Sequence, residues 1–599
     1  MPNRSIQPQY YNFQEELDEL YSKSKNGESF SDLYSLIIDE RNIKLAFGTI
    51  KSNQGSNTPG TDGLTIKDYK VFSESEIINL VRDKLSNFKP DSVKRVFIPK
   101  SDGKDRPLGI PTMIDRIIQQ SFKQILEPIV EARFYEHSYG FRPLRSTHHA
   151  IARTNFLINI NKLHYCVDID IKGFFDNINH NKLIKQLWNI GIRDNKVLMI
   201  VKKMLKCEIE GEGIAAKGTP QGGILSPLLA NVVLNELDHW VASQWHKFPT
   251  DNPYEDNRAR YRVQKTKTKL KQGFIVRYAD DFKIFTDSYN SAKRWFHAIK
   301  NYIEKNLKLE ISDAKSKITN LRRKKTLFLG IEFKAVAKKN KFVAQSYVPK
   351  TTMKNIQVNI KRKIKMIRMN TIPAKVSELN SYIRGLHNYY EVATQVNKAF
   401  HRIAYHSNKA MYNRLKNNVT FHTDTGSNKG YKKSRYKTFS VEGIQTIPLA
   451  NISHSSAMNF SQGHTIYSRE SRIKYGHKEK ALHMKQAFAY LERNFVPYRS
   501  IEFNDNRLRR FAQTNGRCEV SGIEMAYCPE MVRCHHVTRR KDGGDDNYKN
   551  LIIVHELVHR LLHATTSHII ENLMNILMLN QKQLDKLNKL RQNMNLFDI

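Results

Sequence analysis

The sequence predicts a multidomain α+β protein. Its 599 residues exceed what one hydrophobic core organises, and a hydrophobic content of 40% is sufficient for folding throughout. Apolar residues alternate on both sides of the acidic pair Asp280-Asp281, which indicates a strand, a tight turn and a second strand. After Lys350 the apolar residues recur at helical spacing instead. We therefore expect a mixed region followed by a helical one.

The charge of the chain points to a polyanionic partner. The formal net charge is +40, and lysine and arginine are spread over the whole sequence. Five scattered cysteines do not form a disulfide framework, which favours a reducing compartment. The amino terminus lacks the apolar core of a signal peptide, and no run is long enough to span a bilayer. We expect a soluble protein of the bacterial cytoplasm or of an organelle, without a membrane partner.

The first hundred residues lead into a basic hairpin. Residues 1–40 form an amino-terminal extension with a partial helical stripe, and residues 52–63 are a loop. Residues 92–111 have the pattern of a hairpin with its turn at Asp102-Gly103. Its basic residues are Lys94, Arg95, Lys100, Lys104 and Arg106. They suit phosphate contacts, although a merely soluble loop explains the hairpin equally well when it is taken alone.

The predicted strand over residues 165–171 has one apolar and one acidic face. Asp168 and Asp170 lie on the acidic face. Such a face is costly unless it meets solvent or a cation, and solvent is the commoner answer. If a cation is the answer, Asp170 is the natural third carboxylate to join Asp280 and Asp281.

The acidic pair and the glycines before it suggest phosphoryl transfer. Two like charges in one turn repel each other unless a divalent cation lies between them, and oxygen ligands favour Mg²⁺ or Mn²⁺. Asp is also a common turn residue, so the pair alone is weak evidence. A glycine-rich turn at 218–223 opens onto an amphipathic helix, which allows close approach of an anionic substrate. Together these parts describe two-metal chemistry, most simply at the hydroxyl end of a nucleic-acid primer.

Several motifs resemble those of one polymerase class. The run YADD at 278–281 resembles the signature of reverse transcriptases, and DIKGFFDNI at 170–178 resembles their first catalytic motif. RPLGIP (106–111), SYGFRPLRS (138–146) and TPQGGILSPLLAN (219–231) also match, in the right order. Residues 41–345 are thus similar to the fingers and palm of a right-hand reverse transcriptase of the group II intron type.

The resemblance implies roles for individual residues. It implies Mg²⁺ ligands at Asp170, Asp280 and Asp281. For the dNTP it implies triphosphate contacts from Lys100 and Arg106, a gate against a 2′-hydroxyl at Phe175, a pocket role for Gln221, and the motif lysine at Lys315. The run Phe328-Leu329-Gly330 resembles the primer-grip turn.

Residues 346–420 are expected to form a helical thumb. Their apolar stripe, most simply a core face, consists of Met353, Ile356, Ile360, Ile364 and Ile367, and basic residues occupy the other faces. The run SYIRGLHNYY at 381–390 resembles the maturase motif of intron-encoded reverse transcriptases, where thumb and RNA-binding region coincide. Residues 421–505 then take the place of a DNA-binding region. There, NKGYKKSRYKTF at 428–439 interleaves aromatic and basic residues, which suits nucleic-acid contacts, and a disordered charged linker fits almost as well.

Histidines cluster in residues 506–570. His559 and His563 are one helical turn apart, so both can bind one cation, with His535 arriving from a preceding strand. His536 points away from His535 if that segment is extended, and it is then free to act as a general base. Order and spacing resemble an HNH nuclease of the ββα-metal type. The resemblance implies His536 as base, Asn550 orienting the loop, and the other three histidines around a metal, expected to be Mg²⁺.

Two features of this region depart from the simplest pattern. HELVH at 555–559 also fits a zinc-protease motif with Glu556 as base, but the nuclease interpretation explains more residues. Intron-encoded HNH domains usually carry two Cys-x-x-Cys pairs for a structural zinc, whereas Ser521 and Val558 stand at two of the four positions here. A structural zinc is therefore doubtful. The helix expected at 571–599 is then a source of stabilising packing.

The combined expectation is a group II intron-encoded protein that binds intron RNA, promotes splicing, nicks a DNA target and copies the intron into DNA from dNTPs. Its oligomeric state is left open. One alternative is a non-enzymatic splicing factor on a polymerase scaffold, against which the three carboxylates argue. Another is a reverse transcriptase of a retron or a CRISPR-linked system, against which SYIRGLHNYY and the carboxyl-terminal histidines argue.

Overall fold

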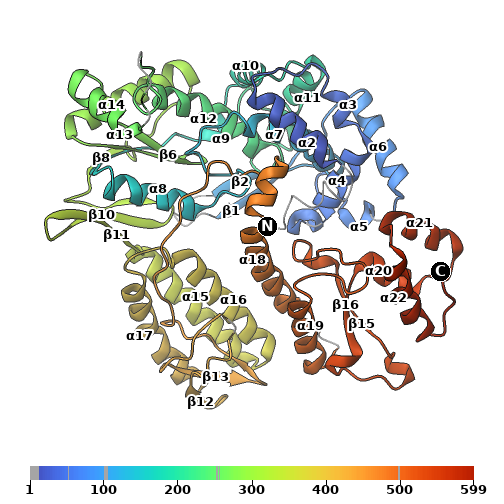
Figure 1. Ribbon diagram of the computed structural model, residues 1–599. Helices are drawn as coiled ribbons and strands as arrows, with labels where there is room; N and C mark the ends of the chain where they lie inside the picture. The colour runs from blue at the N-terminus through green and yellow to red at the C-terminus, as the bar shows by residue number, and fades with distance from the viewer. Residues whose placement is uncertain are drawn as a thin grey trace. The chain divides into compact units, whose positions relative to one another are not determined.

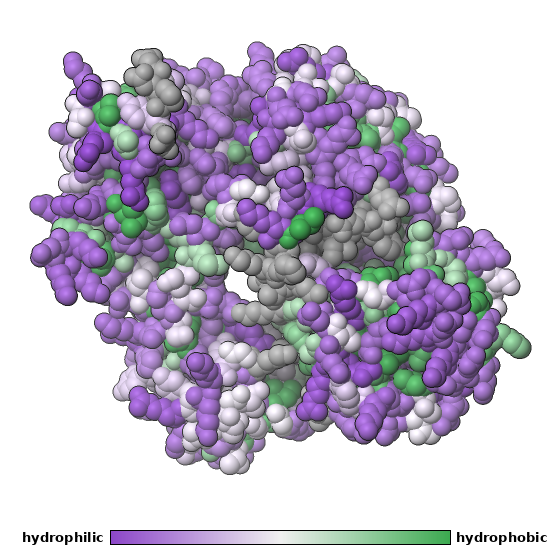
Figure 2. Space-filling model, in the orientation of Figure 1, coloured by the Kyte–Doolittle hydropathy of each residue, from purple (hydrophilic) through white to green (hydrophobic). Residues whose placement is uncertain are grey.

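The computed structural model describes residues 13–51, 53–69, 71–99, 105–250, 254, 256–428, 430–494, 496 and 499–599. The chain forms two compact units, with the boundary between Ser468 and Arg469. This boundary lies inside the segment expected to be a DNA-binding region. Among the described helices, none combines the length and the apolarity needed to cross a membrane. Figure 2 shows hydrophilic side chains over most of the viewed surface, in keeping with the high charge.

The first unit begins with helices packed around α7 (Met113–Glu131), which is buried along almost its whole length. They are α2 (Gln14–Lys25), α3 (Tyr34–Ile37), α4 (Glu40–Lys51), η1 (Gln54–Asn57), α5 (Ile66–Tyr69) and α6 (Glu74–Ser86). The predicted basic hairpin is confirmed, since β1 (Lys94–Pro99) and β2 (Asp105–Ile110) pair antiparallel. Its turn, Lys100 and Lys104 lie outside the described residues.

A four-stranded antiparallel sheet forms the middle of this unit, in the order β6-β7-β3-β8. The strands are β3 (Tyr165–Ile169), β6 (Phe274–Tyr278), β7 (Asp281–Thr286) and β8 (Lys317–Asn320). The same part of the chain contains α8 (Thr147–Asn159), α9 (Phe174–Asn177), α10 (His180–Ile190), α11 (Asn195–Leu205), the β4 (Glu208–Ile209) and β5 (Gly213–Ile214) pair, α12 (Ser226–Ser243), α13 (Asn257–Lys267), α14 (Tyr289–Tyr302) and η2 (Ile303–Leu307). Of these, α8, α12 and α14 contact the sheet. Both predicted acidic strands are thus confirmed as neighbours.

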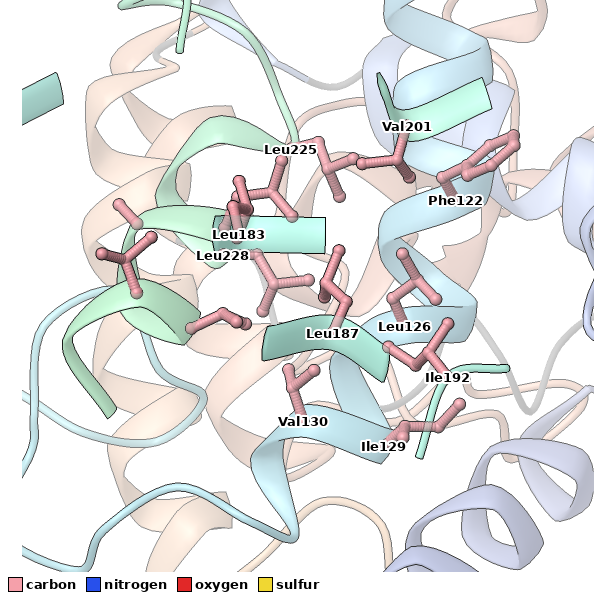
Figure 3. Close-up of a cluster of buried hydrophobic side chains, with 14 of the residues drawn as sticks. Phe122, Leu126, Ile129, Val130, Leu183, Leu187, Ile192, Val201, Leu225 and Leu228 are labelled. Carbon is pink, nitrogen blue, oxygen red and sulfur yellow. The ribbon is translucent and has the colours of Figure 1, made fainter. Parts of the chain in front are cut away.

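The sheet is buried on both faces. One face contributes Val167 and Ile284 to a core shared with the first helices. In Figure 3, Leu126 of α7, Leu187 of α10 and Leu228 of α12 point toward one another in this core. The other face contributes Cys166, Val276 and Phe285 to a core shared with the helices that follow the sheet. Polar residues on these strands are therefore enclosed, and each needs a partner.

The helical region after the sheet agrees with the predicted stripe. A three-stranded sheet of β9 (Thr326–Phe328), β10 (Ile331–Lys338) and β11 (Lys341–Tyr347) leads into α15 (Lys350–Met369), α16 (Pro373–Tyr390) and α17 (Val396–Leu415). Figure 1 shows these three helices packed together. On α15, Ile356, Ile360, Ile364 and Ile367 are buried. The basic residues Lys354, Lys361, Arg362, Lys365 and Arg368 are exposed.

Residues after α17 fold back onto the same helices. They form β12 (Phe421–Thr423), β13 (Lys437–Val441) and β14 (Ile444–Gln445), and Phe439 is fully buried in the thumb core. Tyr431 donates its hydroxyl proton to, or accepts one from, Nδ1 of buried His387 at 2.9 Å. Tyr436 bonds His401 in the same way at 2.8 Å. Phe439 therefore packs inward and Tyr431 and Tyr436 are half-buried, while the basic residues Lys432, Lys433, Arg435 and Lys437 are exposed, so nucleic-acid contacts of this segment stay a prediction.

The second unit holds a ββα element among helices. It comprises α18 (Arg469–Arg493), α19 (Ile501–Gln513), η3 (Pro529–Met531), β15 (Val532–His536), η4 (Arg540–Asp542), η5 (Tyr548–Asn550), β16 (Leu551–His555), α20 (Glu556–His563), α21 (Ser567–Leu577) and α22 (Gln581–Gln592). β15 and β16 pair antiparallel and α20 follows directly. Leu573 and Leu587, on α21 and α22, join its core. The single helix expected at 571–599 is wrong, because the chain turns at Met578 between α21 and α22, but the predicted packing of this stretch is confirmed.

Two of the four positions expected to bind a structural zinc are Ser521 and Val558, and side chains of α22 bond the backbone near them. Gln583 donates to the carbonyl of Ser521 at 2.7 Å, and Arg591, which is 2% exposed, donates to the carbonyls of Leu561 and Ala564 at the end of α20. Val558 is fully buried among apolar side chains. With serine and valine at these positions, the donor set does not fit a four-ligand zinc.

One ion pair is completely enclosed in the first unit. Arg277 on β6 makes a forked contact with Asp238 on α12, with Nη2 and Oδ2 2.6 Å apart and both side chains 0% exposed. Removing one partner from such a pair leaves an uncompensated charge in the interior, which costs about 3–5 kcal/mol.

We expect Asp238→Asn to lower the unfolding midpoint of this unit substantially, because Arg277 then stays buried without its counter-charge. Thermal unfolding of the full chain, followed by calorimetry, measures the shift. Lys300→Met is the control, because it breaks an ion pair with Asp313 at the surface and should leave the midpoint nearly unchanged. Equal shifts for the two variants would contradict the importance of the buried pair.

Candidate active sites

The acidic turn lies where sequence predicts it, between two paired strands. Tyr278 of β6 pairs with Asp281 of β7, so Ala279 and Asp280 form a two-residue turn. Ala279 has φ of +56°, in the left-handed region that costs energy for an alanine. Gly140 lies directly against this turn, and a Cβ added to it would be 2.3 Å from the backbone nitrogen of Ala279. Only glycine therefore allows this approach.

Buried polar groups hold the turn from behind. Arg277 donates from Nη1 to Oδ1 of Asn231 and to the carbonyl of Ala279, both at 2.8 Å. Asn231 in turn donates to the carbonyl of Gly140 at 2.7 Å. The predicted motifs at 138–146 and 219–231 thus meet at the acidic turn. Sequence analysis did not identify Arg277, because its partner Asp238 lies 39 residues away.

Asp170 lies at the same edge of the sheet as the acidic pair. Ile169 pairs with Phe282, so the next residues along the two strands are Asp170 and Asp281. The carbonyl of Asp170 accepts from the backbone of Ser312 at 2.7 Å, and Nζ of Lys315 is 3.7 Å from its Oδ2. Asp280 is exposed at the tip of the turn.

The carboxylates share an edge without forming a closed cluster. Among the described residues, the sets of three ligand atoms within 4.8 Å of one another are His535, His559 and His563, and Glu136, His137 and His246. The three aspartates are not such a set. Three carboxylates at one solvent-facing edge nevertheless fit oxygen-preferring divalent cations, which would draw them together.

The acidic face predicted on the first strand is neutralised by a lysine. Nζ of Lys283 is 2.5 Å from Oδ1 of Asp168 and 3.1 Å from Oδ1 of Asp281. Burial raises the pKa of Asp281, and the charge of Lys283 acts against this rise. The cation that meets Asp168 is thus the ammonium group of Lys283, whereas solvent was expected as the commoner answer. Lys283 was missed, although it alternates with Asp281 on one strand face.

Segments expected to form the nucleotide pocket converge beside this edge. The backbone N–H of Thr219 donates to the carbonyl of Phe175 at 2.7 Å, and Gln221 donates to Oδ1 of Asp176 at 3.0 Å. Gly222 packs against Gly109, where a Cβ would be 2.6 Å from the carbonyl oxygen. Arg106 is exposed on β2, and Lys100 lies outside the described residues. The structure thus brings the motifs of Phe175, Gln221 and Arg106 together.

The predicted primer-grip turn joins the sheet region to the helical region. Leu329 and Gly330, with φ of +49° and +68°, form the two-residue turn between β9 and β10. Tyr389, near the end of SYIRGLHNYY, donates its hydroxyl to the carbonyl of Leu329 at 2.9 Å. The maturase-like motif therefore contacts this turn directly, which its sequence position did not indicate.

The second unit brings three predicted histidines together. His535 on β15 faces His559 and His563 on α20, with ring centroids 4.8 to 5.4 Å apart. Nε2 of His535 is buried and has no hydrogen-bond partner. Burial lowers the pKa of His535 to about 3 and that of His559 to about 4, so both rings are neutral at physiological pH. Neutral imidazoles around an unpaired buried nitrogen fit a divalent metal.

His536 faces away from this trio, as predicted, but it is not free. Its Nε2 bonds Oδ1 of Asp546 at 2.8 Å, and Phe503 stacks on its ring. Asp546 is 7% exposed and also accepts from the hydroxyl of Ser500 at 2.5 Å. The carboxylate thereby fixes the orientation of the imidazole. Asp546 lies in the loop before Asn550, and sequence analysis did not identify it.

Asn550 closes the loop between the two strands. Its Oδ1 accepts from the backbone of Thr538 at 2.7 Å, and its Nδ2 donates to the carbonyls of Thr538 and Asp545. Gly544 also lies against Thr538, because a Cβ added at this glycine would be 1.9 Å from the carbonyl oxygen of Thr538. These bonds fix the conformation of the loop, and a role of Asn550 in a nuclease site stays a prediction.

The HELVH run does not form a metalloprotease site. His555 is the last residue of β16 and caps α20, where its Nδ1 accepts from Leu557 at 3.2 Å. Glu556 is ion-paired with Arg533. His555 is therefore not on a shared helix face with His559, and the choice against the protease interpretation is supported.

Comparisons with known proteins agree with the motifs of the first unit. The family described as reverse transcriptase (RNA-dependent DNA polymerase) matches residues 98–333. The group II intron-encoded protein LtrA of Lactococcus lactis subsp. cremoris is 30% identical over 444 residues, covering 63% of this chain and 73% of LtrA. Protein YkfC of Escherichia coli (strain K12) is 34% identical, covering 45% of this chain and 74% of YkfC. Nuclear intron maturase 2, mitochondrial, of Arabidopsis thaliana is 29% identical over 22% of this chain and 24% of that protein.

Because His535 and His555 are buried, we expect the folding stability of the second unit to decrease at acid pH. Burial holds the pKa of His535 at about 3 and that of His555 at about 4 in the fold, against about 6.5 in an unfolded chain. Below about pH 6.5 the unfolded state binds protons that the folded state does not. We therefore expect stability to fall from about pH 6.5 down to about pH 4, by about 1.4 kcal/mol per pH unit for each histidine.

Unfolding of the full chain at a series of pH values measures this slope. His555→Asn keeps a side-chain acceptor at the start of α20 and should make the slope shallower. His568→Asn, at an exposed position, is the control and should leave it as in the wild type. A slope unaffected by His555→Asn would refute the assignment.

Proposed function

This chain belongs to the family of group II intron-encoded proteins, the reverse transcriptases and maturases of these introns, and we propose that its two sites carry out the successive steps of intron mobility. The first site would copy intron RNA into DNA. The second would nick the DNA target and so provide a primer end.

For copying, Asp170, Asp280 and Asp281 would hold two Mg²⁺ ions. Bound there, these ions would activate the primer hydroxyl and stabilise the leaving pyrophosphate. The observation that carries this assignment is the strand register, which puts Asp170 and Asp281 at one edge beside the exposed Asp280. Lys315, 3.7 Å from Asp170, would then neutralise charge at the incoming dNTP.

The segments beside this edge would form the dNTP pocket. Phe175 and Gln221 lie on two segments that are hydrogen-bonded to each other, and we propose that Phe175 excludes a 2′-hydroxyl while Gln221 lines the pocket. Arg106 and Lys100 would contact the triphosphate. The exposed position of Arg106 on β2 supports a contact with a bound anion.

We propose that the thumb binds intron RNA and a duplex. The buried isoleucine face of α15 leaves its lysines and arginines on the surface, where phosphates can reach them. A contact from Tyr389 to Leu329 would connect this RNA-binding region to the primer grip. Splicing would then follow from stabilising the folded intron, a role that needs no chemistry from the protein.

For nicking, the second unit would act as an HNH-type endonuclease. His535, His559 and His563 would hold one divalent cation, which would stabilise charge on the scissile phosphate. His536 would take the proton of the attacking water through Nδ1, because Asp546 already occupies Nε2. Asn550 would keep the loop that carries Asp546 in place.

We expect the Asp280→Ala, Asp281→Ala double variant to lower primer extension on an RNA template by about 10³-fold or more, because it removes two of three ligands of a charge-stabilising centre. Asp313→Ala, which removes an exposed carboxylate on the same unit, is the control and should retain synthesis. Undiminished synthesis by the double variant would reject the two-metal assignment.

We expect His536→Ala to lower DNA nicking, assayed with intron RNA present, by about 10²-fold to 10⁴-fold while primer extension stays normal. Asp546→Asn should slow nicking in the same direction, since the imidazole loses its orienting charge. His568→Ala is the control. Equal nicking by wild type and His536→Ala would remove His536 as the base.

A further inference from the structure

We propose that Lys283 is a positioning residue for DNA synthesis, holding the carboxylate of Asp281 so that one of its oxygens remains directed to the metal edge. This inference rests on the proposed role of Asp281 as a metal ligand. It adds a residue that belongs to none of the motifs by which the copying site is recognised.

Lys283 is enclosed in the palm sheet. It is 3% exposed and lies in the middle of β7, opposite Asp168 of β3 and Val276 of β6. A lysine in such a place is costly unless its ammonium group is fully paired. Its two carboxylate contacts, at 2.5 and 3.1 Å, satisfy this requirement. Lys283 is therefore a buried residue with two specific carboxylate partners and not a surface charge that happens to lie near the edge.

The contacts of Lys283 with Asp168 and with Asp281 have different consequences. Asp168 lies directly across the ladder, and its side chain is 15% exposed, so this contact alone would already neutralise the buried charge. The second contact goes to Asp281, two residues earlier on the same strand face, whose side chain is 42% exposed. Neutralising the charge of Lys283 does not require this second contact. Lys283 bonds Oδ1 of Asp281, and the backbone of Leu329 also donates to this carboxylate, so its rotation at the metal edge is restrained.

Lys283 also lies beside the primer-grip turn. Its Nζ is 5.5 Å from the ring centroid of Phe328, the last residue before Leu329 and Gly330. The same side chain thus contacts the strand that carries a metal ligand and the strand that leads to the primer-grip turn. Displacement of Lys283 would alter the geometry between Asp281 and the primer end, which is the kind of small misplacement that slows a positioned reaction.

The test separates positioning of Asp281 from neutralisation of Asp168. Three variants of the full chain are compared, Lys283→Met, Asp168→Asn and the double variant Asp168→Asn, Lys283→Met. The double variant replaces a buried pair by neutral groups of similar size, so its fold is retained even if Lys283→Met alone is unstable. Single-turnover addition of one nucleotide to a primer on an RNA template is measured at saturating dNTP across a range of Mg²⁺ concentrations.

We expect Lys283→Met and the double variant each to reduce the maximal rate by about 10-fold to 100-fold and to raise the Mg²⁺ concentration for half-maximal rate, with template–primer affinity unchanged. Asp168→Asn should stay within about 3-fold of the wild type, because Lys283 still holds Asp281. A wild-type rate and Mg²⁺ dependence in the double variant would overturn the inference, since Lys283 would then serve only to neutralise Asp168.

Asp281→Ala is measured in the same assay to distinguish this inference from the proposed function. If Asp281→Ala abolishes synthesis while the double variant matches the wild type, the role of Lys283 is refuted and the metal site stands. If Asp281→Ala retains synthesis, the metal-ligand assignment itself fails, and the positioning role fails with it. A slow double variant beside an inactive Asp281→Ala supports both.

Discussion

The copying centre depends on the enclosed ion pair between Arg277 and Asp238. Neither side chain is exposed, and an unpaired charge in such a place would be prohibitive, so β6 and α12 cannot separate while the unit stays folded. The same guanidinium also holds Asn231 and the carbonyl of Ala279. Through these bonds one buried residue sets the geometry of the acidic turn. The carboxylates of the acidic turn thereby obtain a rigid support from the interior.

The palm and the thumb are connected by polar contacts of the same kind. Tyr389 of the maturase-like motif donates to Leu329 in the turn between β9 and β10, while Lys283 lies beside Phe328 at the start of that turn. The residues after α17, up to Phe460, share the core of the thumb helices. A segment that the family places in DNA binding is therefore, up to the boundary at Ser468, part of the polymerase unit in its packing.

The carboxyl-terminal unit is stabilised by the packing of its apolar core. Where the predicted zinc pattern requires cysteines, this chain has a buried Val558 and a turn at Ser521 bonded by Gln583. The final helix α22 also caps α20 through Arg591. This packing holds the strand and the helix that carry the histidine trio. In the proposed function, this trio makes the primer end that the aspartates of the other unit extend.

Sequence patterns identified the elements that depend on local periodicity. The hairpin at the acidic pair, the strand before Asp170, the isoleucine stripe of α15 and the helical spacing of His559 and His563 all agree with the structure. Periodicity and turn chemistry act over a few residues, so one chain is sufficient to read them. Motif resemblance then led to the reverse transcriptase family, which the comparisons support.

Only the tertiary structure decided which side chains meet. Lys283 bonds Asp168, which lies 115 residues away in the sequence, and Tyr389 bonds Leu329, which lies 60 residues away. Phe439 is buried among the thumb helices. His536 finds Asp546 within the same small unit, yet through a loop whose path no spacing rule specifies. A buried polar group must be paired, but sequence alone does not say which of many distant partners the packing will bring to it.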